Sequence, residues 1–592
     1  MSRSCFRHAA LALAFASPAA FAFNVYTVGG DAACGYAFIQ DAIDAAKNNP
    51  GEDYVFIASN RTYDDQHLKV DNDDVDIVGG FPDCTQLGDP GLLQTTIGGT
   101  GGHSVLEIEG SSHVYLSNFV LTGAVMDADH SGGGIYFGGE GSLYVRYSWI
   151  FANQAGYGGG IDVSPSGPTD FTLTASTVSL NTALVSGGGV RIEGPTTMYA
   201  TATATDDVYI TTNAALGQDA TGYGGGIEVL GPAVANVSAN INSNTAPNGA
   251  GIAAIGTGGG SALVNFYTTN AAMPATLYGN VAANEGGGVF LVPSGASYAK
   301  LCAADFSIAQ NHAGVGSAVT AAADGDGNGA IAFLNQAVCD LPGDAVACVP
   351  GPGCNEVDGN VSSGGFTSAT FYVGGSSAFA ASRVRIHANQ ATEIVYFDAS
   401  VAETNGGDYV HLHDCLIVGN SIEDNLLYAF GAAGGTSMVV DTCTIADNAL
   451  GDNFYVIGAD TNFLEITNSI IYQPNQPSAI YFGPAGDMTA DYILTNDTIP
   501  FTGHAGIIDG APQFVDAANG DYRLARTSPG VDFAPAIDGV DFDGNPRSVD
   551  LADVPNGDGW LDLGAFEIQE QLPPAACRVA DTIYCNGFEA NE

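Results

Sequence analysis

One short pattern recurs along the middle of the chain: a cluster of glycines that runs into an aliphatic residue. It occurs seven times at spacings of 25 to 37 residues, and the last copy is degraded. The copies read GGGI at 132, GGGI at 158, GGGV at 187, GGGI at 224, GAGI at 249, GGGV at 286 and GVGSAV at 314. Because a repeat of this period indicates stacked supersecondary units, the pattern predicts a solenoid.

A second pattern interleaves with the first, an aliphatic residue followed three positions later by asparagine. It occurs at Ile150–Asn153, Val178–Asn181, Ile210–Asn213, Ile241–Asn244, Val281–Asn284, Ile308–Asn311, Ile386–Asn389, Ile417–Asn420 and Ile445–Asn448. The segments between are short and β-prone, without helical periodicity, so the units are predicted to be coils of a parallel β-helix. We expect the asparagines to adopt a left-handed backbone at one corner and to form an amide ladder there.

The segments IFANQAGYGGGI, VSLNTALVSGGGV and INSNTAPNGAGI resemble the repeat of chlamydial polymorphic outer-membrane proteins and of many bacterial β-helix proteins. The resemblance implies an all-β, right-handed parallel β-helix over residues 101–504, with an irregular insertion at 321–365. It implies no particular chemistry, because one fold hosts unrelated activities.

The first 100 residues are predicted to hold an export signal and a cap. Residues 1–22 have a basic start, an apolar stretch and an Ala-Phe-Ala cleavage site, which predicts a secreted or cell-surface protein, in keeping with a Gram-negative bacterium. Within 23–100, Ile39, Ile43 and Ala46 form an apolar helical stripe. This opening resembles the plug helix of the pectate-lyase-like superfamily, which covers the end of the solenoid.

The cysteines predict a disulfide framework. The chain has 11 cysteines, and removal of Cys5 with the signal leaves ten, an even number in an exported chain. The pairs we expect are Cys34–Cys84, Cys302–Cys339, Cys348–Cys354, Cys415–Cys443 and Cys577–Cys585. Zinc binding is the alternative, although the chain has no CxxC pair.

Charge limits the partners. The chain has 14 Lys and Arg against 64 Asp and Glu, a formal net charge of −50, which disfavours nucleic acid and anionic membranes. No later segment has about 20 uninterrupted apolar residues, so no membrane-spanning segment is predicted. We expect a monomer that meets a glycan or another cell-surface ligand.

The sequence pattern changes at about residue 505, toward the C-terminus. Residues 511–568 resemble the choice-of-anchor Q module that ends many bacterial β-helix proteins, on Asp521-Tyr522-Arg523-Leu524, Ser528-Pro529, the segment 543–547 and the segment 562–567. Phe533-Ala534 departs from the small residue and glycine usual there. The resemblance implies a β-rich C-terminal cap at 505–568, followed by a tail at 569–592.

Two acidic segments are calcium candidates, and calcium is the cofactor that this chain could use. Asp324, Asp326 and Asn328 alternate as in a calcium loop, but Asn335 stands where the bidentate glutamate would be. The second set is Asp553, Asn556, Asp558, Asp562 and Glu567. The alternative for the second set is that these acids bond backbone amides and Arg547.

Catalytic motifs are scarce. Arg383, Arg385 and His387 form the densest basic spot and are the weak catalytic candidates, because a polyuronate lyase needs cations; the alternative is a solvated outer face. Outward aromatic residues could bind sugar rings, but the sequence does not separate them from core aromatics. We therefore predict a non-enzymatic adhesive or glycan-binding scaffold. A polysaccharide lyase or glycoside hydrolase is the alternative.

Overall fold

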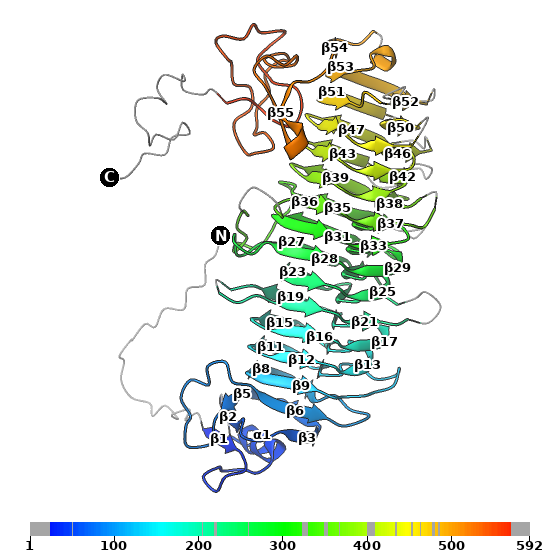
Figure 1. Cartoon of the computed structure of the whole chain (residues 1–592). Helices are drawn as coiled ribbons and strands as arrows, with labels where there is room; N and C mark the ends of the chain where they lie inside the picture. Colours follow the sequence, from blue (N-terminus) through cyan, green and yellow to red (C-terminus); the bar gives the residue numbers. More distant parts are fainter. Residues whose placement is uncertain are drawn as a thin grey trace, which may run out of the picture.

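The computed structural model describes residues 24–569 except 50, 52, 204, 218–221, 259, 323–328, 349–352, 366, 399–408, 432–434, 452–453, 462, 476–479, 484–485 and 502. Over the described residues the chain is a parallel β-helix that rises from the N-terminal to the C-terminal end (Figure 1). The signal segment 1–22, the calcium candidates Asp324, Asp326 and Asn328, and Cys577 and Cys585 lie outside the described residues.

Each full coil contributes four strands to three sheets. The first sheet has 14 described strands, in spatial order, and its strands alternate between core-facing and outward-facing residues. They are β4 (Leu68–Asp71), β7 (Leu106–Glu109), β10 (Ile135–Phe137), β14 (Ile161–Val163), β18 (Val190–Ile192), β22 (Ile227–Leu230), β26 (Ile252–Ile255), β30 (Val289–Val292), β34 (Val319–Ala322), β38 (Ala369–Gly374), β42 (Glu393–Asp398), β46 (Leu427–Phe430), β50 (Ile457–Ala459) and β52 (Ile480–Phe482).

The second sheet has 30 described strands and is bent along its length into two rows. The first row is β1 (Val25–Val28), β2 (Asp53–Ala58), β5 (Asp74–Phe81), β8 (Ser111–Ser117), β11 (Glu140–Arg146), β15 (Thr169–Thr174), β19 (Thr196–Thr201), β23 (Val234–Ser238), β27 (Ala262–Tyr267), β31 (Ala299–Ala304), β35 (Ala330–Leu334), β39 (Ala378–Ser382), β43 (Tyr409–His413), β47 (Ser437–Asp441), β51 (Phe463–Tyr472) and β53 (Asp487–Thr495). The second row is β3 (Tyr63–Gln66), β6 (Thr95–Gly99), β9 (Phe119–Thr122), β12 (Trp149–Phe151), β16 (Thr177–Ser179), β20 (Tyr209–Thr211), β24 (Asn240–Asn242), β28 (Ala275–Tyr278), β32 (Phe306–Ala309), β36 (Glu356–Asp358), β40 (Arg385–His387), β44 (Leu416–Val418), β48 (Thr444–Ala446) and β54 (Ile507–Asp509).

The third sheet has ten described strands and closes each coil. They are β13 (Gln154–Tyr157), β17 (Thr182–Ser186), β21 (Ala214–Ala215), β25 (Thr245–Asn248), β29 (Val281–Glu285), β33 (His312–Ala313), β37 (Val361–Ser362), β41 (Gln390–Ala391), β45 (Ser421–Ile422) and β49 (Ala449–Leu450). Inward-facing aliphatic and phenylalanine side chains from all three sheets form one continuous core along the axis.

The asparagine ladder is confirmed and has ten rungs. In the first nine rungs the backbone N–H donates to the side-chain oxygen of the next rung at 2.9–3.1 Å, and the side-chain amide donates to the same oxygen. In all ten rungs the side-chain amide also donates to the backbone carbonyl of an aliphatic residue in the preceding coil. The rungs are Asn153, Asn181, Asn213, Asn244, Asn280, Asn311, Asn360, Asn389, Asn420 and Asn448. Every buried amide of the corner is therefore paired, as buried polar groups must be.

Two details of the ladder prediction are wrong. The rung assigned to Asn284 is Asn280, which follows Leu277 at the same spacing, and the rung Asn360 was missed. The left-handed backbone is not at the asparagines either. Positive φ values of 52–65° fall on the residue before each rung, so that residue, and not the asparagine, turns the chain at the corner.

The glycine clusters form the corner that faces this ladder. The first glycine of each cluster has a positive φ, a conformation that glycine adopts without the usual Cβ penalty, and in the degraded copy this residue is Gly316. The later glycines are required by close packing. A Cβ on Gly134 would lie 2.6 Å from Ile150 and 2.8 Å from the Gly160 carbonyl oxygen.

The N-terminal helix is confirmed as α1 (Ile39–Lys47), and its buried stripe packs against β1, β2, β4 and β5 at the blue end of Figure 1. At the opposite end, the short helix η1 (Ile499–Phe501) places Phe501 in the main core. Both ends of the core thus receive apolar side chains from outside the regular coils, as an open solenoid end requires.

The C-terminal module lies beside the last coils. β54 still belongs to the coil sheet, and after it come only η2 (Ala517–Asn519), β55 (Phe514–Asp516) and β56 (Asp521–Leu524) among the described residues. Outward residues of the second strand row, such as Leu416 and Val418, pack against Tyr522 and Phe566 of the module. The module appears in orange to the left of β47 and β51 in Figure 1.

The irregular segment 321–365 contains regular coil strands. β35, β36 and β37 continue their sheets, and the inserted part is the loop of residues 335–355 between β35 and β36. Two disulfides hold this loop, Cys302–Cys339 and Cys348–Cys354, as the sequence predicts. Cys34–Cys84 is likewise confirmed at the N-terminal end.

The predicted Cys415–Cys443 disulfide is wrong, because both thiols are free and buried. The cysteines do stack on adjacent coils, where the Cys415 N–H points at the Cys443 sulfur at 3.3 Å. Stacked residues of a parallel sheet keep their side chains parallel at about 4.8 Å, whereas a disulfide needs its two Cβ atoms about 3.8 Å apart. The thiols instead point at backbone carbonyls of Ala381 and Leu412.

Candidate functional site

An outward-facing column of tyrosines runs up the first sheet near the C-terminal end. Tyr372, Tyr396 and Tyr428 are paired in register on β38, β42 and β46. Val395 and Phe397 beside Tyr396 are buried in the core, so strand alternation turns the tyrosine outward. The rings of Tyr372 and Tyr396 stack with centroids 5.5 Å apart, and those of Tyr396 and Tyr428 meet edge to face at 5.7 Å.

The column is interrupted by Gly458 on β50 and resumes at Tyr481 on β52. The missing side chain leaves a groove of about 500 Å³. A Cβ on Gly458 would lie 3.2 Å from both Asn425 and Tyr428, so the glycine forms the floor of the groove. The groove is lined by Thr367, Glu393, Tyr396, Asp424, Asn425, Tyr428, Phe430, Phe454, Tyr455, Gly458 and Tyr481.

Aromatic rings remain accessible at the rim. Tyr481 is 43% exposed and Phe430 is 48% exposed, and the ring of Tyr455 lies 5.4 Å from that of Tyr481. Such rings usually fill a core or an interface, so their exposure around a hollow makes it a candidate binding surface.

Two carboxyl groups and an amide supply the polar side of the groove. Burial raises the pKa of Glu393 to about 8 against the lowering effect of the hydrogen bond from the Thr392 hydroxyl, and the charge of Asp424 adds a smaller rise. Burial also raises the pKa of Asp424. Asn425 accepts the Tyr455 N–H at 2.8 Å, which fixes the loop that carries Asp424.

The sequence analysis missed this groove, although part of its signal is visible. Tyr396 lies between the two apolar residues Val395 and Phe397, so strand alternation identifies one outward tyrosine. The alignment of Tyr396, Tyr428, Gly458 and Tyr481 depends on loop lengths that differ from coil to coil, so only the register of the folded sheet brings them together.

The weak catalytic candidates separate into two environments. Arg383 has a φ of 53° at the bend between β39 and β40, and with Arg385 it lines a second pocket, of about 450 Å³, against the C-terminal module. His387 lies on the same outward face of β40 as Arg385, where it contacts the Glu356 carboxylate and lies 3.3 Å from Asp358, but it does not line that pocket. The two arginines therefore line the pocket, whereas His387 is paired with acids of the neighbouring strand.

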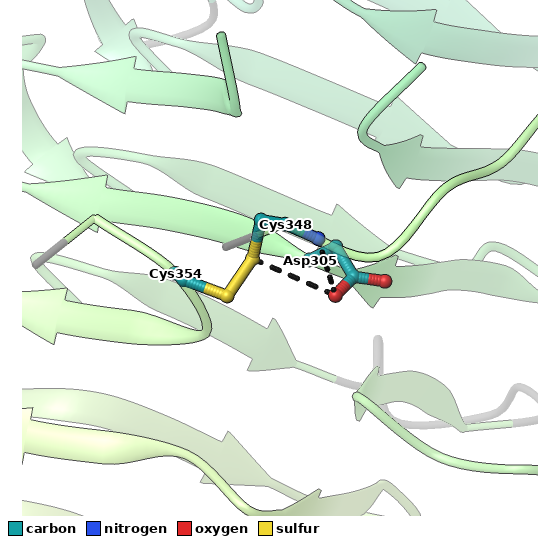
Figure 2. Close-up of side chains that lie close together, drawn as sticks. All are labelled: Asp305, Cys348 and Cys354. Carbon is teal, nitrogen blue, oxygen red and sulfur yellow. Dashed lines mark hydrogen bonds between the residues drawn. A yellow bond between two sulfur atoms is a disulfide. The ribbon is translucent and has the colours of Figure 1, made fainter. Parts of the chain in front are cut away.

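A cluster of Asp305, Cys348 and Cys354 lies on the wall of the second pocket (Figure 2). Figure 2 shows the Asp305 carboxylate beside Cys348, whose backbone N–H donates to it at 3.1 Å. Because the two cysteines form a disulfide, neither sulfur is a thiolate that could bind a metal ion. We therefore interpret the cluster as the anchor of the disulfide loop.

The acids of the second calcium candidate set each contact different partners. The Asp562 carboxylate accepts the N–H groups of Asp532 and Ile568, and that of Glu567 accepts those of Val549 and Asp562. The remaining acids face elsewhere: Asp553 pairs with Arg526, and Asp558 accepts a hydrogen bond from the Tyr492 hydroxyl. The alternative, that these acids accept hydrogen bonds from backbone amides, holds for Asp562 and Glu567.

No family model and no curated protein matches this chain. Among the helices of the described residues, none has the length and apolar character needed to cross a membrane.

Proposed function

We propose that this protein is an exported, non-enzymatic scaffold that binds glycans in the tyrosine groove. The observation that carries the proposal is the tyrosine column broken at Gly458, with accessible rings on both sides of the break. Two coil spacings of about 4.8 Å separate Tyr428 from Tyr481, which leaves about 9–10 Å between their strands. A pyranose ring fits this gap, with its apolar C–H face on an aromatic ring and its hydroxyls near Asp424 and Asn425.

Three further features support the proposal. The disulfides Cys34–Cys84 and Cys302–Cys339 agree with an exported protein. The net charge of −50 favours a neutral glycan over a polyanionic one in a groove that already contains Glu393 and Asp424. The resemblance of residues 511–568 to a choice-of-anchor Q module agrees with display at the cell surface.

One observation favours the alternative, a polysaccharide-degrading enzyme. With a pKa of about 8, Glu393 keeps its proton at neutral pH, as a general acid must, and Asp424 is nearby in the same groove. Against this function, Glu393 is only 1% exposed. A glycosidic oxygen could reach its carboxyl only if the neighbouring side chains moved, so binding is the better-supported function.

The test is a glycan-array screen of the mature protein, followed by titration of the best neutral ligand. We expect Tyr428→Ala and Tyr481→Ala to weaken binding at least about fivefold, because each loses about 1–3 kcal/mol of ring contact. Tyr115→Ala is the matched control, since Tyr115 is also an outward tyrosine stacked on a neighbour, Tyr144, at 5.3 Å but on another face. Unchanged affinity in both groove variants would rule out this site.

The same samples test the enzymatic alternative. Release of reducing ends from the bound glycan by the wild type, and its loss in Glu393→Gln, would establish a hydrolase in place of a binding protein. We expect no cleavage of polygalacturonate, since β-elimination needs a base and several cations beside the substrate, and the groove lining contains no Lys or Arg among the described residues.

A further inference from the structure

A second pocket lies on the opposite side of the coils from the tyrosine groove, where three parts of the chain meet. The parts are the bends of the second sheet, the disulfide loop and the C-terminal module. The pocket has a volume of about 450 Å³ and is lined by Asp305, Asn335, Ala347, Cys348, Cys354, Asn355, Arg383, Arg385, Leu416, Gly520, Arg523, Phe542, Asp543 and Phe566. A monosaccharide-sized ligand fits such a volume.

The pocket concentrates positive charge in an acidic chain. Three arginines, Arg383, Arg385 and Arg523, line it, although the whole sequence has only 14 Lys and Arg. Arg523 is already paired, with Asp521 at 3.1 Å and Asp543 at 2.6 Å. It also lies over the ring of Phe566, which fixes its position.

The other two arginines lack a hydrogen-bonding partner among the described residues, although the charge of Arg383 acts on Asp305 and that of Arg385 acts on Glu356. Within the described part of the chain, the guanidinium groups of Arg383 and Arg385 make no hydrogen bond and no salt bridge, and the Nε atom of Arg385 is buried without a partner. A buried donor without an acceptor is costly, so an oxyanion at this position would gain more than a contact with exposed arginines provides. The φ of 53° at Arg383 recurs at the same bend of other coils, with 56° at Asp305 and 53° at Asp414, and it turns the chain at the pocket wall.

The rest of the lining selects among anions. The carboxylates of Asp305 and Asp543 disfavour a second negative charge, but they can accept hydrogen bonds from ligand hydroxyls. The rings of Phe542 and Phe566, 5.2 Å apart, offer an apolar wall. One anionic group, several hydroxyls and one apolar face are the properties of a sugar acid.

We propose that this pocket binds a small hydroxylated carboxylate of monosaccharide size, with its carboxylate on Arg383 and Arg385. The site is separate from the tyrosine groove and does not depend on the function proposed for that groove. A long polyanion is disfavoured because the acidic surface around the pocket repels it, whereas a single carboxylate meets mainly the two arginines.

The test uses calorimetric titration of the mature full chain with sodium glucuronate and N-acetylneuraminate. Glucose lacks the charge, acetate lacks the hydroxyls, and inorganic phosphate has a second charge, so these three probes separate the contributions. We expect each sugar acid to bind with a dissociation constant of about 10 mM or lower, at least tenfold tighter than each of the three control probes. The affinity should fall as the salt concentration is raised.

Arg383→Gln and Arg385→Gln should each reduce the affinity for the sugar acids at least tenfold. Arg61→Gln is the control, because Arg61 is an arginine at the N-terminal end whose guanidinium donates to the Ala37 carbonyl. Melting curves verify that each variant is folded, and Arg385→Lys, which keeps the charge, should retain part of the affinity if Arg385→Gln is unstable.

Three outcomes would overturn the proposal. They are no saturable binding of either sugar acid by the wild type, equal affinity in the wild type and both glutamine variants, and tighter binding of phosphate than of the sugar acids. Retained sugar-acid binding in Tyr428→Ala, the groove variant, would show that the two sites are independent.

Discussion

The guanidinium group of Arg547 forms an ion pair with the carboxylate of Asp414, 133 positions earlier in the chain. Both side chains are buried, at 1% and 4% exposure. Arg547 also donates to the carbonyls of Gly564 and Ala565, so it joins the C-terminal module to the coil at β44. His413 approaches the same carboxylate from the solvent side, and its hydrogen bond and the charge of Arg547 lower the pKa of Asp414 against the effect of burial.

Arg547→Met is expected to loosen the C-terminal module from the coils. Removing one partner of a buried ion pair leaves the other charge unpaired and costs about 3–5 kcal/mol. We expect a protease to cleave the variant within residues 511–569 at protease concentrations that leave the wild type intact. In calorimetry, the C-terminal module of the variant should melt before the coils. Arg526→Gln is the control, because its ion pair with Asp553 is exposed and is worth about 0–1 kcal/mol. Equal protease resistance of Arg547→Met and the wild type would contradict this role.

Asn181→Val should lower the free energy of unfolding by about 1–3 kcal/mol, because the Asn153 N–H and the Ile150 carbonyl lose buried partners. Asn284→Val provides the comparison, since Asn284 is outside the ladder and its substitution is expected to change stability by no more than about 0.5 kcal/mol. Denaturant unfolding of both variants measures the difference. If both lost the same stability, the ladder would not be the cause.

We expect the protein to lose stability at alkaline pH because of Glu393. Its pKa in the folded protein, about 8, is above the ordinary value of 4.5, so the folded state binds its proton more tightly than the unfolded state. The stability that it contributes is fully present below pH 4.5, declines as pH rises above this value, and is lost as pH passes through 8. Melting temperatures of the wild type and Glu393→Gln across pH 4–9 measure the effect. We expect a smaller decline in the variant, and parallel profiles would refute the assignment.

Cys415 and Cys443 are expected to be thiols that react only after unfolding. Both are buried, and burial raises the pKa of Cys443, which disfavours the reactive thiolate. Alkylation of the native and then of the denatured protein without reductant, followed by peptide mapping, should label these two only in the second step. Cys34, Cys84, Cys302 and Cys339 should stay unlabelled in both steps. A Cys415–Cys443 disulfide peptide would show that the stacked sulfurs do bond.

The sequence by itself determined the repeat, the fold class and most of the ladder. These are local consequences of residue type: glycine is needed where φ is positive or backbones approach closely, and asparagine pairs with its own copy one coil away. In one coil the same spacing fits both Leu277–Asn280 and Val281–Asn284, and only the hydrogen bonds of the folded chain show that Asn280 is the rung. The stripe of Ile39, Ile43 and Ala46 was likewise sufficient to predict α1.

Only the tertiary structure decided where the two candidate sites lie. The tyrosine groove requires Tyr428 and Tyr481 to lie in register on either side of Gly458. The second pocket requires Arg385 of the coils and Phe566 of the C-terminal module to line the same cavity. The same is true of the free thiols, since spacing placed Cys415 beside Cys443 but could not give the direction of their side chains. Contacts between coils and across the module depend on the register of many loops of different length, and register is a property of the folded chain.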